Sequence, residues 1–246
     1  MKTLNKITIV VLLTLFSSLS AFAQNKQADM LSEKRSNPFE KKLRWGISGN
    51  QYWGNIKGQS LPETYFAKPC IGYNLRTEYY PVPFIGLSVG AGFQQRGAGI
   101  INPDKSGGSF THPWENLPFD PDSTYRERLR FFTMEVPVSL IIRSPKDLIR
   151  GVRPSASAGL NFITVKQVRD VFLSVEDGFH SDLPVTTDYF NRDLGYQFSF
   201  GADIDAGGSG LFQVHLVYTK GTKNIYNSGQ GNGTLVTYGF RVSWLY

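Results

Sequence analysis

Apolar and polar side chains alternate with a period of two along most of the chain after residue 42. The clearest stretch runs from Cys70 to Tyr80, and it has Ile71, Tyr73, Leu75, Thr77 and Tyr79 on one face and Gly72, Asn74, Arg76 and Glu78 on the other. Successive side chains of a β-strand point to opposite faces of the sheet. The pattern therefore predicts strands rather than helices.

The same alternation recurs in enough segments to close a barrel. The predicted strands are residues 43–50, 70–80, 84–96, 132–140, 155–162, 193–204, 212–219 and 236–246. Most are close to the ~9–11 residues that a tilted membrane-spanning strand needs. After the first residues, no stretch of 18 apolar residues follows that would predict a membrane-spanning helix.

The segments between these strands alternate in length. Residues 81–83, 143–153 and 205–211 are comparatively short connections. Residues 54–68, 97–126, 166–191 and 220–233 are longer, polar and rich in Gly, Asn, Asp and Pro. Short turns at the periplasmic end and long outer loops are typical of outer-membrane barrels. An even number of strands then leaves both chain ends in the periplasm.

The polar face of the predicted strands favours a membrane barrel over a soluble sandwich. That face is rich in Gly, Ser, Asn and Gln, with isolated charges of both signs in equal number. Unpaired buried charges are costly, so we expect the charges to pair inside a narrow lumen that side chains fill. The predicted lumen charge network consists of Arg44, Arg76, Glu78, Arg96, Glu135, Asp193, Asp203 and Arg241.

Aromatic residues on the apolar face mark the expected membrane interface. Trp45 lies near the start of the first predicted strand, and Trp244 and Tyr246 lie at the end of the last. Such rings sit at headgroup level in membrane proteins. The fold class predicted for residues 43–246 is all-β, an eight-stranded antiparallel up-and-down transmembrane β-barrel in the cell outer membrane.

The first residues predict export. Lys2 and Lys6 precede a short apolar run, and Ala21-Phe22-Ala23 fits the small-x-small cleavage rule, so residues 1–23 are predicted to be a signal peptide. Residues 24–42 are polar and charged and are interpreted as a flexible periplasmic lead-in.

Charge and cysteine content narrow the partners. The formal net charge is +6, and the basic residues are scattered, so a nucleic-acid partner is not expected. The single cysteine, Cys70, can form neither an internal disulfide nor a zinc site, and it is interpreted as a buried inert thiol. No cofactor or metal is expected.

Three segments resemble the PorT-like outer-membrane β-barrel family of Bacteroidetes. They are Phe132-Thr133-Met134-Glu135-Val136-Pro137-Val138, Arg153-Pro154-Ser155-Ala156-Ser157-Ala158-Gly159 and Tyr218-Thr219-Lys220-Gly221-Thr222-Lys223-Asn224-Ile225. The resemblance covers residues 43–246 and implies an eight-stranded barrel, with a type IX secretion or gliding role for some members. From the residues themselves, Pro137 is interpreted as a bulge or strand edge that could re-aim Glu135 into the lumen, or as a tolerated kink.

The chain offers weak signals for catalysis or metal binding. Its histidines are His112, His180 and His215, and only His180 has Ser and Asp beside it in sequence, within a predicted loop. Adjacency in a loop does not fix a catalytic geometry. Asn102-x-Asp104-x-Ser106 and Asp120-x-Asp122 could offer oxygen ligands to calcium, although turn formation explains them as well. No catalytic residue is assigned.

The expected function is non-enzymatic: a structural, interaction or secretion-accessory role at the cell envelope. The expected partners are outer-membrane lipid and envelope or secretion-system proteins that contact the loops at 97–126 and 166–191. Two alternatives remain open. One is a hydrolase of lipid or peptide at the barrel rim, which would depend on His180 or His215. The other is a ligand-binding barrel with a pocket lined by Arg76, Arg96 and Tyr80.

Overall fold

The computed structural model describes most of the part predicted to form the barrel. The described residues are 38–58, 65–101, 125–174, 180–186, 189–207, 210–225 and 233–246. All described residues lie in one compact unit, Asn37–Tyr246. The predicted signal peptide lies outside them.

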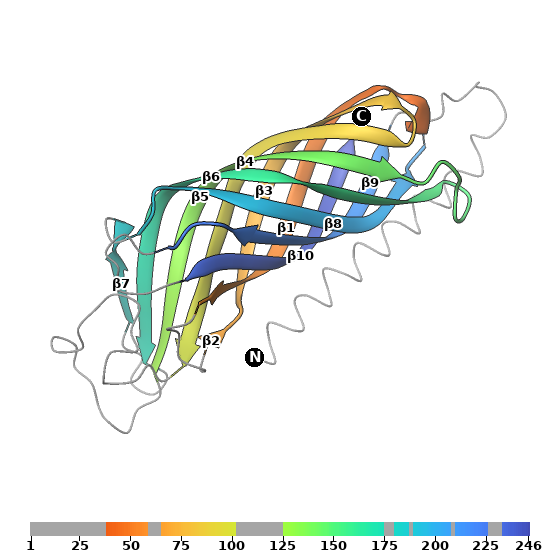
Figure 1. The fold of residues 1–246 in the computed structure, drawn as a ribbon. Helices are drawn as coiled ribbons and strands as arrows, with labels where there is room; N and C mark the ends of the chain where they lie inside the picture. The colour runs from red at the N-terminus through yellow and green to blue at the C-terminus, as the bar shows by residue number, and fades with distance from the viewer. Residues whose placement is uncertain are drawn as a thin grey trace. The chain divides into compact units, whose positions relative to one another are not determined.

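Eight long strands make up the described part of this unit (Figure 1). They are β1 (Leu43–Lys57), β3 (Lys68–Val82), β4 (Ile85–Ile101), β5 (Tyr125–Arg143), β6 (Val152–Ser174), β8 (Arg192–Asp205), β9 (Leu211–Gly221) and β10 (Thr234–Leu245). Two short strands, β2 (Tyr65–Phe66) and β7 (His180–Pro184), pair with the ends of β4 and β6 that lie farthest from the short turns.

The sheet closes on itself. Its long strands follow the order β4-β3-β1-β10-β9-β8-β6-β5, and β5 pairs again with β4. All of these pairings are antiparallel, and the first and last long strands pair from Gly46 with Leu245 to Lys57 with Thr234. Closure removes the unpaired strand edges of an open sheet. The predicted eight-stranded antiparallel up-and-down barrel is confirmed.

The two faces of the barrel wall have the opposite polarity to those of a soluble β-protein. On β9, the inward positions include Gln213, His215 and Thr219, which are buried, and the outward positions include Leu216 and Tyr218, which are exposed. The same inversion recurs around the barrel, where outward Leu75 is 67% exposed and inward Glu78 is 0% exposed. An apolar outer surface around a polar interior is the arrangement that a bilayer requires of a barrel.

No helix among the described residues is both long enough and apolar enough to cross a membrane.

The short connections and the two ends of the barrel-forming segment lie at the same end. The backbone N–H of Tyr246 donates to the carbonyl of Trp45 at 2.8 Å, which places the start of β1 beside the end of β10. The β3–β4, β5–β6 and β8–β9 connections return at this end, and Gly151 and Gly207 adopt a positive φ of 76° in the latter two. This end is the expected periplasmic rim.

Strands β5 and β6 extend farther than the sequence pattern predicts. The loop predicted at 166–191 is wrong over residues 166–174 and 180–184, which belong to β6 and β7. The loop predicted at 97–126 is likewise shortened, because β4 continues to Ile101 and β5 begins at Tyr125. The physical reason in β6 is a bulge: Phe132 pairs with Gln167 and Thr133 pairs with Val165, which leaves Lys166 as an extra residue. One extra residue reverses the alternation and hides the strand.

The end of the predicted lead-in is ordered. Pro38–Glu40 forms the 3-10 helix η1, and Phe39 is buried with Leu211 and Leu245 at the short-turn end of the barrel. The guanidinium carbon of Arg153 lies 4.1 Å from the centroid of the Phe39 ring. Residues 24–37 lie outside the described part.

Candidate functional site

The lumen holds all eight residues of the predicted charge network. Each of them is at most 6% exposed: Arg44, Arg76, Glu78, Arg96, Glu135, Asp193, Asp203 and Arg241. They come from six of the eight long strands, β1, β3, β4, β5, β8 and β10. Each occupies an inward position of the two-residue alternation, which places charges of both signs in one enclosed volume.

Arg96 and Glu135 form one closed pair. Arg96 Nε donates to Glu135 Oε1 at 2.5 Å, and its second guanidinium nitrogen donates to Oε2 at 2.9 Å. Thr133 Oγ1 donates to Oε1 at 2.8 Å, and Asn161 Nδ2 donates to Oε2 at 2.5 Å. A two-point guanidinium–carboxylate contact is among the strongest and most directional in proteins. It fixes β4 against β5 from the inside.

Pro137 lies two residues after this carboxylate. It pairs with Asn161 of β6, while the pairing of β5 with β4 is interrupted between Glu135 and Val138. A Cβ added to Gly90 would lie 3.2 Å from the Pro137 ring, so the ring packs against β4 where the pairing is missing. Pro lacks the N–H that this pairing would use.

Glu78 forms the centre of a second cluster. Arg76 Nε lies 2.9 Å from Glu78 Oε1, and the Tyr80 hydroxyl donates to Oε2 at 2.9 Å. Gln213 Nε2 donates to Oε1 at 3.2 Å from the opposite wall of the lumen. Arg143 in turn donates to the Tyr80 hydroxyl at 2.6 Å. One buried carboxylate thereby links β3, β5 and β9.

The cluster continues through Asp203. Arg143 Nε donates to Asp203 Oδ2 at 2.5 Å, and Ser155 Oγ donates to Oδ1 at 2.8 Å. His215 Nε2 lies 2.8 Å from Ser155 Oγ and 3.4 Å from Asp203 Oδ1. Arg241 lies 3.0 Å from His215 Nδ1. This chain of contacts crosses the lumen from β5 to β10.

Arg44 contacts an aromatic ring, and Asp193 contacts backbone amides. The Arg44 guanidinium carbon lies 4.7 Å from the Tyr80 ring centroid, as a cation over an aromatic face. Asp193 Oδ1 accepts from the backbone N–H of Thr222 at 3.2 Å and of Lys223 at 2.9 Å. Asp193 therefore fastens the segment after β9 to the start of β8.

The sequence interpretation missed Arg143, Ser155 and His215 as network members. Arg143 shares the inward parity of Glu135, but the predicted strand ended at residue 140. Extending the alternation by three residues would have identified it. No signal along the chain pairs Ser155 with His215, because their contact depends on the neighbours of β8 around the barrel.

Ser155, His215 and Asp203 contain the side chains of a hydrolase triad in a different arrangement. In a triad the carboxylate binds His Nδ1–H while Nε2 accepts the serine proton. Here both Ser155 and Asp203 face Nε2, and Arg241 donates to Nδ1. These contacts fit a neutral imidazole with its proton on Nε2, which holds the network together and cannot deprotonate Ser155. All three side chains are buried.

One enclosed cavity in the middle of the lumen is small. A cavity of about 10 Å³ is lined by Asn74, Arg76, Ser88, Gly90, Pro137, Ser139, Gln197 and Arg241. That volume is close to what one water molecule needs. The cavity contains Arg76 but neither Arg96 nor Tyr80, so it is not the ligand pocket of the binding-barrel alternative.

An apolar cluster fills the outer part of the barrel. Its buried members are Ile56, Ala98, Leu129, Phe131, Val165, Val168, Val185, Tyr189, Phe190, Ile225 and Leu235. Phe131 meets Tyr189 edge-on at 5.2 Å between ring centroids and stacks on Phe190 at 5.9 Å. Tyr189 and Phe190 belong to the connection between β7 and β8, so this connection packs into the barrel. We call these residues the outer plug.

The outer surface carries two levels of aromatic rings. Trp45 and Tyr246 lie 5.8 Å apart, and Trp244 and Tyr246 lie 5.9 Å apart, at the short-turn end. Trp53 stacks with Tyr238 farther along the barrel, at 6.3 Å. Trp45 and Trp53 share one face of β1, and at ~3.3 Å per residue they are ~26 Å apart along the strand. A tilt of ~40° leaves ~20 Å along the barrel axis, close to the ~25 Å apolar band of such barrels.

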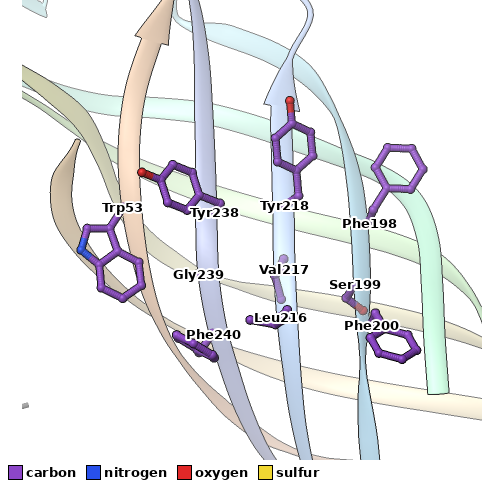
Figure 2. Close-up of a pocket in the computed structure, with 10 residues that line it drawn as sticks. All are labelled: Trp53, Phe198, Ser199, Phe200, Leu216, Val217, Tyr218, Tyr238, Gly239 and Phe240. Atoms are coloured by element: carbon purple, nitrogen blue, oxygen red, sulfur yellow. The ribbon is translucent and has the colours of Figure 1, made fainter. Parts of the chain in front are cut away.

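A shallow apolar groove lies on the outside near Trp53. Figure 2 shows its rings, with Trp53, Tyr238 and Phe240 on one side of β9 and Phe198 and Phe200 on the other. The groove has a volume of about 700 Å³. The floor of the groove lies at residues that occupy inward positions, so that backbone forms the surface there, as at Gly239. It lies on the apolar outer surface rather than in the lumen.

The remaining candidate residues are placed as follows. His112, the possible calcium segments at 102–106 and 120–122, and the side chain of His180 lie outside the described residues. Cys70 is buried, and its Sγ donates to the Lys68 carbonyl at 3.3 Å. Within the described ranges, no group of three or more His, Cys, Asp or Glu is placed to hold a metal ion.

Comparisons with known proteins find similarity only among solved structures. No family model matches the chain, and no curated protein matches it. Ail, the attachment invasion locus protein of Yersinia pestis, is 11% identical over 84% of this chain and 100% of its own, with a TM-score of 0.39. Neisserial surface protein A is 9% identical over 82% and 97%, with a TM-score of 0.41.

The outer membrane protein OprG from Pseudomonas aeruginosa is 13% identical over 83% of this chain and 94% of its own, with a TM-score of 0.35. At these TM-scores the similarities carry no argument about function. The barrel assignment follows from the strand pairing itself. The PorT-like resemblance stays a prediction.

Proposed function

We propose that this chain is a non-enzymatic outer-membrane β-barrel that acts through its surface rather than as a conduit. The observation that carries the proposal is the filled lumen inside an apolar wall. Ion pairs occupy its centre, one enclosed cavity there is about 10 Å³, and the outer plug packs inside the end of the barrel that lies opposite the short turns. An eight-stranded barrel has just enough interior for side chains.

The membrane location has a direct test. The protein should be recovered in the outer-membrane fraction, and unboiled samples should migrate differently from boiled samples on a gel because the closed barrel resists detergent. A protein found free in the periplasm would contradict the proposal. The mature N-terminus, determined on the same sample, tests signal-peptide cleavage near Ala23.

The absence of a conduit is tested separately. Vesicles that contain the purified protein should swell in sugar solutions no faster than empty vesicles, since ion pairs and the outer plug lie across the lumen. Single-channel currents of a porin type would show that the lumen opens. In that case the barrel fold would be correct, but the proposal that the protein acts through its surface rather than as a conduit would be wrong.

As a finer proposal, the barrel serves as an accessory of an envelope machinery such as type IX secretion. The support is the resemblance of residues 43–246 to PorT-like barrels. A barrel with a filled lumen can contact other proteins only through its surface. Crosslinking in intact envelopes followed by purification should recover secretion-system components. Recovery of lipid alone, with unchanged secretion in a deletion strain, would oppose it.

A further inference from the structure

A second groove on the outer surface, between β3, β4 and β5, combines an apolar floor with cations at one end. The groove has a volume of about 430 Å³. Its outward lining residues include Ile71, Tyr73, Phe93, Gln95, Phe132 and Lys166. Ile71 and Tyr73 are each 65% exposed, and Tyr73 and Phe93 lie 6.0 Å apart between ring centroids. Exposed aromatic and aliphatic side chains of this kind contact hydrocarbon in a membrane barrel.

The lower part of this groove lies within the apolar band. Tyr73 pairs with Gly49 of β1, and Gly49 lies between Trp45 and Trp53 along that strand. Phe93 pairs in turn with Tyr73. An occupant of this part must therefore be a hydrocarbon chain, because a water-soluble partner cannot reach it through the membrane.

Cations line the other end of the groove and the surface beyond it. Arg126, Arg128 and Arg130 alternate with buried residues on β5, so they share the outward face that carries Phe132. Alternate residues of a strand are ~7 Å apart, which makes this a regular row of charge. Arg130 is directly opposite Arg169 of β6. Like charges facing each other destabilise a sheet unless an anion lies between them.

The bulge in β6 adds a further cation at the junction. Lys166 is the extra residue of the bulge, and it is exposed on the same side as its neighbour Gln167. A regular strand would have turned one of these two side chains inward. The bulge therefore places an ammonium group directly at the edge of the apolar groove, below the arginine row.

Within the part of the chain that the structure describes, this row lacks neutralising acidic neighbours. Among the described residues, Asp182 pairs with Arg169 at 2.9 Å, and no acidic side chain lies within ion-pair distance of Arg126, Arg128, Arg130 or Lys166. On β4, the positions paired with Arg130 and Arg128 are Gly97 and Gly99, which carry no side chain.

We infer that this groove binds one anionic acylated amphiphile, a phosphate-bearing lipid, at the outer face of the membrane. Its acyl chain lies along Tyr73, Phe93 and Phe132, and its phosphate is bound by Lys166 and Arg130, with Arg128 above. The inference rests on the proposed membrane location. Guanidinium and ammonium groups at a headgroup level match a phosphate in charge and in hydrogen-bond donors.

The test uses purified full-length protein in neutral detergent micelles and three probes. Dioleoyl phosphatidic acid has both features of the ligand, dioleoylglycerol lacks the phosphate, and glycerol 3-phosphate lacks the acyl chains. Binding is measured by native mass spectrometry and by titration at fixed ionic strength. Phosphatidic acid should bind with a stoichiometry of one at the groove, and each of the other probes should bind at least tenfold more weakly.

Two variants connect that binding to the groove. The triple change Arg128→Ala, Arg130→Ala and Lys166→Ala should weaken phosphatidic acid binding at least tenfold, and Phe93→Ala should weaken it several-fold. Lys146→Ala removes an exposed charge at the short-turn end and should leave binding unchanged, as should Phe200→Ala in the other groove. Heat-modifiable migration of each variant shows that the barrel is folded.

Three results would overturn the inference. Equal binding of glycerol 3-phosphate would show a free-phosphate site without the groove, and equal binding of dioleoylglycerol would show a groove without the cations. An equal loss in Lys146→Ala would show attraction by overall charge alone. Because the micelle assay does not depend on cellular location, these failures differ from a failure to find the protein in the outer membrane.

Discussion

The centre of the lumen and the outer plug fill the same barrel by different interactions. At the centre, inward positions are charged or polar and are held by ion pairs such as Arg96 with Glu135. Strand β5, which carries Glu135, also carries Leu129 and Phe131. These two inward residues belong to the outer plug, are apolar and pack against Tyr189 and Phe190. Strand β5 passes through both layers without any change in its backbone hydrogen bonding to β6 except the bulge.

The difference shows that one barrel wall can enclose two interior layers that are held together by different interactions. Apolar packing tolerates changes of shape that conserve volume, whereas a buried ion pair tolerates neither a missing partner nor a displaced one. The central layer therefore specifies the register between strands, and the outer plug packs above these charges, toward the end of the barrel opposite the short turns. Because ion pairs strengthen where water is absent, apolar packing above the charges favours their pairing.

The largest effect is expected from breaking a pair in the central layer. Glu135→Leu leaves Arg96, which is 0% exposed, without its carboxylate, and should lower the free energy of unfolding by ~3–5 kcal/mol. The double variant Arg96→Met with Glu135→Leu should recover most of that loss, because no unpaired charge remains. Urea unfolding in lipid vesicles measures both. A double variant as unstable as the single one would contradict this account.

A smaller effect is expected from opening the outer plug. Phe131→Ala removes a ring that is 0% exposed and should cost ~3 kcal/mol through lost burial and a residual cavity. The neighbouring Phe132→Ala is the matched control, since Phe132 faces outward and its loss should cost less than ~1 kcal/mol. The same vesicle unfolding assay compares them. Equal losses would mean that residues 131 and 132 lie in equivalent surroundings.

The short-turn end offers an intermediate case, because Phe39 combines packing with charge. Phe39→Ala removes contacts with Leu211 and Leu245 and the ring beneath Arg153, and should cost ~2 kcal/mol. Phe39→Leu keeps the packing and should cost about half as much. If both variants unfold like the wild type, η1 does not stabilise the barrel.

The smallest effect lies outside both layers. Arg153 Nε donates to Asp147 at 2.6 Å and the Gly151 N–H donates at 3.0 Å, and these contacts lower the pKa of Asp147 in the folded state. Its stabilisation is therefore present above the unfolded pKa of ~3.9 and is lost as the pH falls through the folded value. Because Asp147 lies at the surface, Asp147→Asn should change stability by less than ~0.5 kcal/mol at pH 7, and the difference should shrink as the pH falls below ~3.9. Unfolding measured across this range checks the sign.

The sequence patterns predicted the strands of the barrel wall but not the contacts between the side chains inside the barrel. Alternation identified all eight long strands, because inward and outward positions differ in polarity along each of them. It also placed Arg96 and Glu135 on the inner face, although nothing in the sequence indicates that these two residues pair. The contact of Ser155 with His215 depends on registers that link β6, β8 and β9, which no local pattern encodes. The outer plug was missed because all of its residues lie beyond the ends of the predicted strands.

The pairing of β1 with β10 has a consequence for how the barrel forms. These strands are the first and last to be made, and they are joined over their length from Gly46 with Leu245 to Lys57 with Thr234. Contacts between such distant parts of a chain form slowly, because a long loop must close before any of them is gained. We expect the pairing of β1 with β10 to be the rate-limiting step of barrel assembly. During assembly, the backbone amides of this pairing should be the last to become protected from hydrogen exchange.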